Sequence, residues 1–116
     1  MGNNILKNIN GFNLSLDILI ACFNSSAYLD NLFEKIIQLK KIQNIKINLI
    51  ILDDGSSDDT WDILTNKCVL FSNLRLYKNE KNMGVFFSRL KLINLATSDF
   101  IIFIDADDYI SSNAVE

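Results

Sequence analysis

The sequence predicts an α/β fold with a mainly parallel sheet, in which strands and helices alternate in the order βαβαβαβ. Four short apolar runs lie along the chain, and each interval between them carries apolar residues at helical spacing. The connections between these segments are short, as they are in βαβ units. A length of 116 residues is enough for one domain with a hydrophobic core.

The first half of the chain contains two of the predicted strands. Residues 1–15 are rich in Asn and are expected to form a weakly ordered arm. The first strand is expected from Asp17 to Phe23, a run rich in Ile, and the second from Ile45 to Leu52. Between them a helix is predicted after residues 24–26, which are of helix-capping types. Its apolar residues recur at helical spacing: Tyr28, Leu29, Leu32, Phe33, Ile36 and Ile37.

The second half of the chain continues the alternation. A second helix is expected near Ser56, with Ser56 and Asp59 as a capping-box pair and with inward-facing Trp61, Leu64 and Cys68. The third strand is expected from Leu74 to Tyr77. The third helix opens at Gly84 and carries on one face Phe86, Leu90 and Ile93. The fourth strand, Phe100 to Ile104, is continuously apolar, which predicts that both of its faces are buried.

The composition excludes several classes of function. The net charge of −3 gives no basic surface for nucleic acid. The absence of histidine excludes Ser-His-Asp catalysis and histidine metal sites, so any metal is expected to be Mg²⁺ or Mn²⁺ bound by oxygen. Cys22 and Cys68 are expected to be a reduced pair. No apolar run is long enough to cross a membrane, and a cytoplasmic location is expected.

Polar residues that follow the predicted strands form the candidate site. Asn24, the Asp53-Asp54 pair and the segment from Asp105 to Asp108 each come directly after a strand. Parallel strands end at the same edge of a sheet, and open α/β sheets bind ligands in the crevice at that edge. The two acidic clusters, about fifty positions apart along the chain, are therefore expected to lie side by side.

The segment Asp105-Ala106-Asp107-Asp108 predicts a hard-cation site. Mg²⁺ and Mn²⁺ take one or two protein carboxylates, and substrate phosphates complete the shell. Such an ion offsets the charge of a diphosphate leaving group. The alternative is a solvated acidic turn that caps the segment after it.

The remaining candidates each have a functional and a purely structural interpretation. One carboxylate of the Asp53-Asp54 pair can accept a base N–H, or the pair belongs to a strand, turn and helix cap. The segment from Asn82 to Gly84 belongs to the site or is a plain turn before a helix. Arg89 pairs with an acidic cluster, pairs with a diphosphate, or lies on the surface.

Four segments together resemble family 2 glycosyltransferases: residues 17–24, 52–60, 82–84 and 103–108. They occur in that family's order and spacing and cover most of the chain. The resemblance implies a GT-A fold whose Rossmann-like, nucleotide-sugar-binding half occupies residues 16–116. It also implies a nucleotide-diphosphate sugar donor, often a UDP-sugar, and inverting transfer to an acceptor hydroxyl with Mn²⁺ or Mg²⁺.

The resemblance also implies a role for individual residues. Residues 21–23 would lie along the nucleoside, Asp53 or Asp54 would meet the base, and Asp107 would lie near the ribose and sugar. The implied metal-binding residues are Asp107 and Asp108. The full implied nucleotide-binding set is Ala21, Cys22, Phe23, Asn24, Asp53, Asp54, Gly84, Arg89, Asp105, Ala106 and Asp107.

The sequence departs from the family pattern in three places. Ala21 stands where a proline is usual, and Ser88-Arg89-Leu90 stands where Ala-Arg-Asn is frequent. The chain ends at Glu116, so the acceptor-binding half and the catalytic base are expected beyond it, and no catalytic residue is assigned within the chain. The chain alone is therefore expected not to transfer sugar, and a nucleotide-binding module without transfer activity is the alternative.

Other α/β classes fit the sequence less well. A nucleotidyltransferase would carry a Gly-rich, basic loop after the first strand, where this chain has Asn24-Ser25-Ser26. A receiver-like domain would bring its acids from the first and third strands.

The acceptor stays open between a glycan, a lipid and a protein. Self-association through an exposed face is expected. For the full-length protein, the alternative to a cytoplasmic location is peripheral attachment to the inner face of the membrane.

Overall fold

The computed structural model describes residues 14–42 and 44–107 of the chain. Its elements are β1 (Leu14–Cys22), the 3-10 turn η1 (Ser26–Tyr28), α2 (Leu29–Leu39), β2 (Ile45–Asp54), α3 (Thr60–Cys68), β3 (Leu74–Asn79), α4 (Val85–Leu95) and β4 (Phe100–Asp105). This order confirms the predicted α/β class and the βαβαβαβ alternation. None of the helices in these ranges has the length and apolar character needed to span a bilayer.

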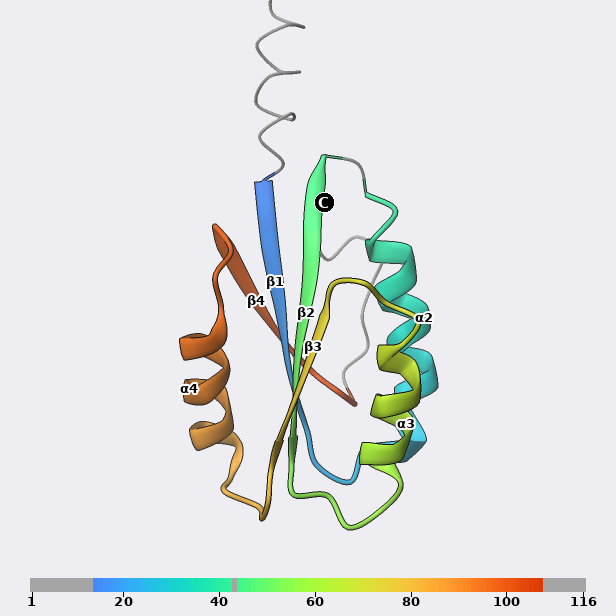
Figure 1. Cartoon of the computed structure of the whole chain (residues 1–116), viewed down its shortest axis with the longest axis vertical. Helices are drawn as coiled ribbons and strands as arrows, with labels where there is room; N and C mark the ends of the chain where they lie inside the picture. Colours follow the sequence, from blue (N-terminus) through green and yellow to red (C-terminus); the bar gives the residue numbers. More distant parts are fainter. Residues whose placement is uncertain (1–13, 43, 108–116) are drawn as a thin grey trace, which may run out of the picture.

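The order in which the strands are added to the sheet changes direction at β1. All four strands are parallel and lie in the order β3-β2-β1-β4. Helices α2 and α3 cover one face of the sheet and α4 covers the other (Figure 1). The first two crossovers step outward from β1 to β3, whereas the third, through α4, returns to the far side of β1. A topological switch point, where open α/β sheets bind ligands, therefore lies between β1 and β4.

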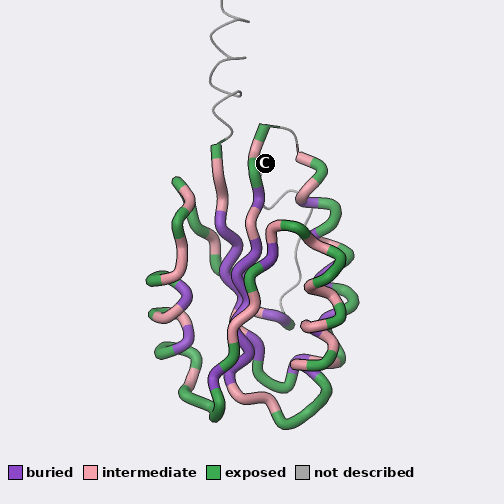
Figure 2. The backbone as a smooth tube through the Cα atoms, viewed as in Figure 1, coloured by how far each residue is buried: buried purple, intermediate pink, exposed green. Residues whose placement is uncertain are grey.

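The core has two unequal layers because side chains alternate between the faces of a strand. Ile18, Ile20 and Ile51 point toward α2 and α3 and belong to the larger cluster. The alternate residues face α4, where a smaller cluster consists of Leu19, Ile50, Leu52 and Leu92. Figure 2 shows the buried residues concentrated in the central strands. The sheet is thus a rigid platform whose strand ends can hold polar side chains in place.

A buried carboxylate ties β1 to the loop before β4. Asp17 is fully buried, and its Oδ2 accepts hydrogen bonds from the backbone N–H groups of Thr97 at 2.7 Å and Ser98 at 3.0 Å. Its Oδ1 accepts from Asn48 Nδ2 at 3.2 Å and from Ser98 Oγ. Burial raises the pKa of Asp17, but the hydrogen bonds from Ser98, Thr97 and Asn48 outweigh it and hold this pKa below its ordinary value. The group is therefore ionised at neutral pH.

The capping-box prediction for the second helix is wrong. Helix α3 begins at Thr60, and the hydroxyl of Ser56 donates to Asp53 instead of to a helix N–H. The side chain of Asp58 takes the capping role, since its Oδ1 accepts from Thr60 N at 2.9 Å. A carboxylate two residues before the N–H that it accepts forms a local turn that competes with the box. Within α3, Leu64 is fully buried as expected, while Trp61 and Cys68 are half-buried.

The prediction that both faces of the fourth strand are buried is wrong in the described part of the chain. Strand β4 pairs with β1 along one edge, and three of its side chains are exposed: Phe100, Ile101 and Phe103. The apolar face predicted for α4 also points outward, because Phe86, Leu90 and Ile93 are exposed, Phe86 by 75%. Instead α4 turns Ser88 and Leu92 to the sheet. Self-association through such a face stays a prediction.

Candidate functional site

The candidate residues meet at the carboxyl edge of the sheet. Cys22 lies beside Asp53, Ala21 beside Asp105, and Asp54 beside Asn79 in the strand register. Strand β1 therefore separates the Asp53-Asp54 pair from the acidic segment at the end of β4. The pair lies within β2 rather than after it, because the strand continues to Asp54, two residues past its expected end at Leu52. Its position within a strand fixes which face each carboxylate occupies.

Asp53 faces the side of the sheet covered by α2 and α3. It is fully buried, and its Oδ1 accepts hydrogen bonds from the backbone N–H of Ser56 at 3.2 Å and from the Ser56 hydroxyl. Its Oδ2 is buried without a hydrogen-bond partner among the described residues. Beside it, burial raises the pKa of the Cys22 thiol to about 12, with further contributions from the charges of Asp53 and Asp58. Cys22 is a buried, protonated thiol, and both cysteines are free.

Asp54 faces α4 and holds the loop that leads into it. Its Oδ1 accepts from Asn79 Nδ2 at 2.9 Å and from the backbone N–H of Met83 at 2.8 Å. Its Oδ2 accepts from the backbone N–H of Gly84 at 3.0 Å. Gly84 has a φ of 95°, a region that favours glycine. A carboxylate oxygen can accept two hydrogen bonds, so Oδ2, which accepts only the Gly84 bond among the residues that the structure describes, has room for a second donor.

A small cavity opens between the ends of β1 and β2 and the start of α4. Its volume is about 170 Å³, and five of its lining residues belong to the site predicted from sequence: Ala21, Cys22, Phe23, Asp54 and Gly84. Of the three other lining residues, sequence reasoning left Asn82 open between the site and a plain turn, and it did not assign Val85 or Ser88 to the site. Asn82 lies in the same short motif as Gly84, and Ser88 is one turn further along the helix. Their proximity to Gly84 was a usable signal.

Asn24 joins two loops at the edge of this cavity. It has a φ of 50°, and its Oδ1 accepts hydrogen bonds from the backbone N–H groups of Ser57 at 2.8 Å and Asp58 at 3.3 Å. Its own backbone N–H donates to Ser56 Oγ at 2.8 Å. The geometry gives Asn24 the role of fixing the β2–α3 loop against the end of β1. It does not line the cavity described above.

Arg89 and Asp105 form an ion pair next to the switch point. One guanidinium nitrogen of Arg89 lies 3.0 Å from Asp105 Oδ1 and 3.2 Å from Oδ2. The guanidinium carbon lies 5.5 Å from the centre of the Phe103 ring. Both partners are about two-fifths exposed, so a ligand at the edge can reach them. The pair connects α4 to the beginning of the acidic segment.

The acidic segment supplies two accessible carboxylates within the described residues, Asp105 in its ion pair with Arg89 and the exposed Asp107. Ala106 is buried and Asp107 is exposed, while the predicted metal ligand Asp108 lies outside the described residues. Within residues 14–42 and 44–107, no three acidic or cysteine side chains form a cluster that could hold a metal ion. Mg²⁺ and Mn²⁺ need only one or two protein carboxylates when substrate phosphates complete the shell. The oxygen donors at this edge fit such an ion.

Comparison with known proteins identifies the class. The chain belongs to glycosyl transferase family 2, whose family model matches residues 17–116. A processive diacylglycerol β-glycosyltransferase of Mycoplasma genitalium is 30% identical over 86% of this chain and 29% of its own length. WfaP of Escherichia coli, a UDP-Glc:α-D-GlcNAc-diphosphoundecaprenol β-1,3-glucosyltransferase, is 33% identical over 81% of this chain and 36% of its own length.

Solved structures agree with the fold. S. aureus TarS in complex with UDP-GlcNAc superposes with a TM-score of 0.75 at 24% identity, over 87% of this chain and 29% of that chain. The mannosyltransferase PcManGT of Pyrobaculum calidifontis, in complex with GDP-Man and Mn²⁺, gives 0.73 at 15% identity, over 84% of this chain and 29% of that chain. The GT-A type of α/β fold is thereby confirmed. The chain spans about a third of the length of these proteins.

Proposed function

We infer that this chain carries the donor-binding part of a glycosyltransferase that uses a nucleotide-diphosphate sugar, with UDP as the nucleotide. The observation that carries the inference is the cavity at the switch-point edge, where Asp54 Oδ2 retains an open acceptor position. Membership of the family supports a transferase reaction. Metal dependence and inversion of the anomeric centre, both implied by the family resemblance, belong to the same proposal.

Asp54, rather than Asp53, is the residue that meets the base. Asp54 lines the cavity, whereas Asp53 faces the opposite side of the sheet and bonds Ser56. Uracil presents an N3–H donor, which suits a carboxylate oxygen with an open acceptor position. Cytosine presents an unprotonated N3 acceptor there, and two acceptors facing each other repel. A site built around a hydrogen-bond acceptor therefore rejects the base that lacks the donor.

The diphosphate would extend from the cavity toward the end of β4. Ala21 to Phe23 would lie along the nucleoside, with Arg89, Asp105 and Asp107 beside the phosphates and sugar. Asp107 and Asp108 would hold Mn²⁺ or Mg²⁺, which offsets charge on a departing diphosphate when bound. Arg89 would also bind a phosphate oxygen. Its guanidinium group is held near the phosphates by the ion pair with Asp105, so only a small movement of the side chain is needed.

Titration calorimetry with UDP and CDP tests the base contact. We expect UDP to bind at least about tenfold more tightly than CDP, because one hydrogen bond to a charged group contributes about 1.5 to 3 kcal/mol and 1.4 kcal/mol corresponds to about tenfold. Asp54→Asn should abolish the difference between the UDP and CDP affinities. The ratio of the two affinities is informative even if the loop at Met83 and Gly84 loosens, because that loosening weakens the binding of both ligands. Asp53→Asn is the matched control and should keep the ratio. Equal affinities for UDP and CDP in the unaltered chain would refute the assignment.

The metal assignment has its own test. UDP should bind more tightly in Mn²⁺ than in EDTA, and Asp107→Ala should reduce this difference. UDP affinity that is the same with and without the ion would count against metal binding at the acidic segment. The base test and the metal test are independent, so one part of the proposal can fail while the other stands.

A further inference from the structure

A second, larger cavity lies on the side of the Met83–Gly84 loop away from the donor cavity. It is a cleft of about 630 Å³ between the end of β3 and α4, lined by Lys78, Asn79, Glu80, Lys81, Met83, Phe87 and Lys91. It shares no lining residue with the donor cavity. The cleft therefore does not belong to the site described above.

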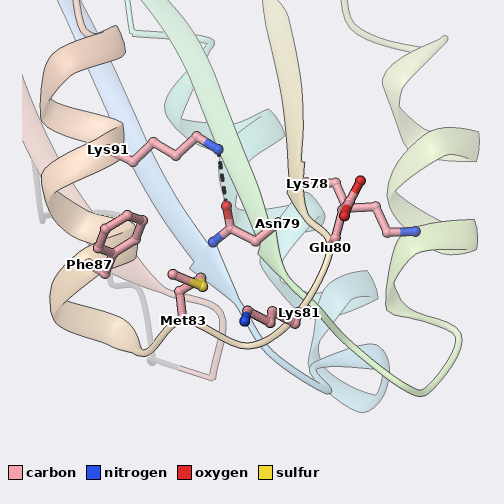
Figure 3. Close-up of a pocket in the computed structure, with 7 residues that line it drawn as sticks. All are labelled: Lys78, Asn79, Glu80, Lys81, Met83, Phe87 and Lys91. Atoms are coloured by element: carbon pink, nitrogen blue, oxygen red, sulfur yellow. Dashed lines mark hydrogen bonds between the residues drawn. The ribbon is translucent and has the colours of Figure 1, made fainter.

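The lysines of the cleft are divided between its two sides. Lys78 points away toward α3, where its Nζ lies 4.9 Å from the centre of the Trp61 ring. Figure 3 shows the carboxylate of Glu80 on that same side of β3, away from Lys91. Lys81 and Lys91 remain on the side that faces α4. Of the charged residues that line the cleft, Lys81 and Lys91 thus lie on the α4 side, at different ends of it, and Glu80 lies across β3.

Lys91 is held in place with donors to spare. Its Nζ donates to Asn79 Oδ1 at 3.0 Å, as Figure 3 shows, and Asn79 is itself buried and bonded to Asp54. An ammonium group has three N–H donors, so the bond to Asn79 engages one and leaves others for a ligand. A lysine fixed by a buried amide loses less conformational freedom when it binds an anion than a free surface lysine does.

The other wall of the cleft is apolar. Figure 3 shows the side chains of Met83 and Phe87 next to each other below Lys91. Both are exposed, by 42% and 47%. The cleft has the volume of an ordinary small-molecule site, larger than a bare phosphate needs. An aromatic ring and a thioether beside two ammonium groups suit a ligand with an anionic head and an apolar or planar body.

We propose that the β3–α4 cleft is a binding site for a phosphate ester, with the phosphate on Lys91, the attached group against Met83 and Phe87, and Lys81 adding positive charge at the end of the cleft beside Met83. The chemistry is shared by two sources, an anionic phospholipid headgroup and a soluble phosphate ester. The proposed site has its own lining residues and does not use the proposed donor, although Asn79 and Met83 of the cleft donate to Asp54 of the donor cavity.

The experiment uses phenyl phosphate as the soluble probe and vesicles as the lipid probe. The chain is titrated with phenyl phosphate while the amide signals of Met83, Phe87 and Lys91 are followed by NMR. In a parallel arm it is mixed with phosphatidylglycerol vesicles and with phosphatidylcholine vesicles in a flotation assay. The double variant Lys81→Gln/Lys91→Gln should weaken whichever probe binds by about tenfold or more. Glutamine at 91 can still donate to Asn79, so the variant is expected to fold.

Lys46→Gln is the matched control, because it removes an exposed lysine from the start of β2, at the opposite edge of the sheet. It should leave binding of the probe unchanged. Binding of phenyl phosphate alone assigns the soluble source, and selective flotation with phosphatidylglycerol assigns the lipid source. The proposal is overturned if neither probe binds, or if Lys46→Gln weakens binding as much as the double variant does.

Discussion

Replacing Asp17 by Asn tests how the loop before β4 is held beside β1, where the switch point opens. Asp17 accepts four hydrogen bonds, two of them from backbone N–H groups. Asparagine keeps one acceptor oxygen, which can serve the two backbone donors, and loses the charge and the second oxygen. A hydrogen bond to a charged group contributes about 1.5 to 3 kcal/mol, so Asp17→Asn should reduce the free energy of unfolding by roughly 3 to 5 kcal/mol. That is a large part of the roughly 5 to 15 kcal/mol typical of a domain.

Urea unfolding at pH 7 and at a series of lower pH values is the assay. The folded-state pKa of Asp17 lies below its ordinary value despite burial, because of its hydrogen bonds from Ser98, Thr97 and Asn48. The stabilisation is therefore fully present above the unfolded pKa of about 3.9 and is lost as the pH falls through the lower folded pKa. The difference between the unaltered chain and Asp17→Asn should be constant near neutrality and shrink below about pH 4.

The control for Asp17 is Asp99→Asn, which removes an exposed carboxylate that accepts from Ser15. Its cost should stay below about 1 kcal/mol. The reasoning is refuted if Asp17→Asn costs no more than Asp99→Asn. It is also refuted if the cost of Asp17→Asn is the same at pH 3 as at pH 7.

Two further predictions concern cysteines and glycines. Iodoacetamide at pH 8 should modify Cys68 in the folded chain and spare Cys22, whose pKa burial raises to about 12; mass spectrometry showing Cys22 modified first would contradict this. Gly55→Ala should destabilise the chain more than Gly84→Ala in thermal unfolding. Both glycines have positive φ, but an added Cβ at Gly55 would lie 2.5 Å from the backbone nitrogen of Asn82, while nothing lies within 4 Å at Gly84. Equal losses would show that φ alone sets the cost.

The fold was predictable from local patterns, but the partners of each surface were not. Apolar runs and helical spacing located the four strands and three α-helices of residues 14–42 and 44–107, but not the 3-10 turn η1. The run from Phe100 to Ile104 reads as a strand with two buried faces, yet hydropathy does not encode the neighbours that a strand acquires. The same holds for α4, where Ser88 rather than Phe86 meets the sheet. Short-range patterns fix conformation, and the crossover connections decide what covers each face.

The candidate site was predictable to a similar depth. Parallel strands bring Ala21, Asp54 and Asp105 to one edge by topology alone. The proposal that Asp54 rather than Asp53 meets the base rests on the finding that both lie inside β2, where alternation sends them to opposite faces. The β3–α4 cleft gave no sequence signal, since Lys81 and Lys91 are ten positions apart and line one cleft only because α4 folds back beside β3.

The most direct test of the central claim is where UDP binds. Amide signals of the chain are followed by NMR during a titration with UDP in Mg²⁺, which can bind the phosphates as Mn²⁺ does but without its paramagnetic line broadening. We expect the largest shifts at Ala21, Phe23 and Gly84, at the carboxyl edge. Lys46 and Arg75 line a cavity of about 310 Å³ away from the carboxyl edge and should not respond. The largest shifts at Lys46 and Arg75, with none at Gly84, would contradict the account.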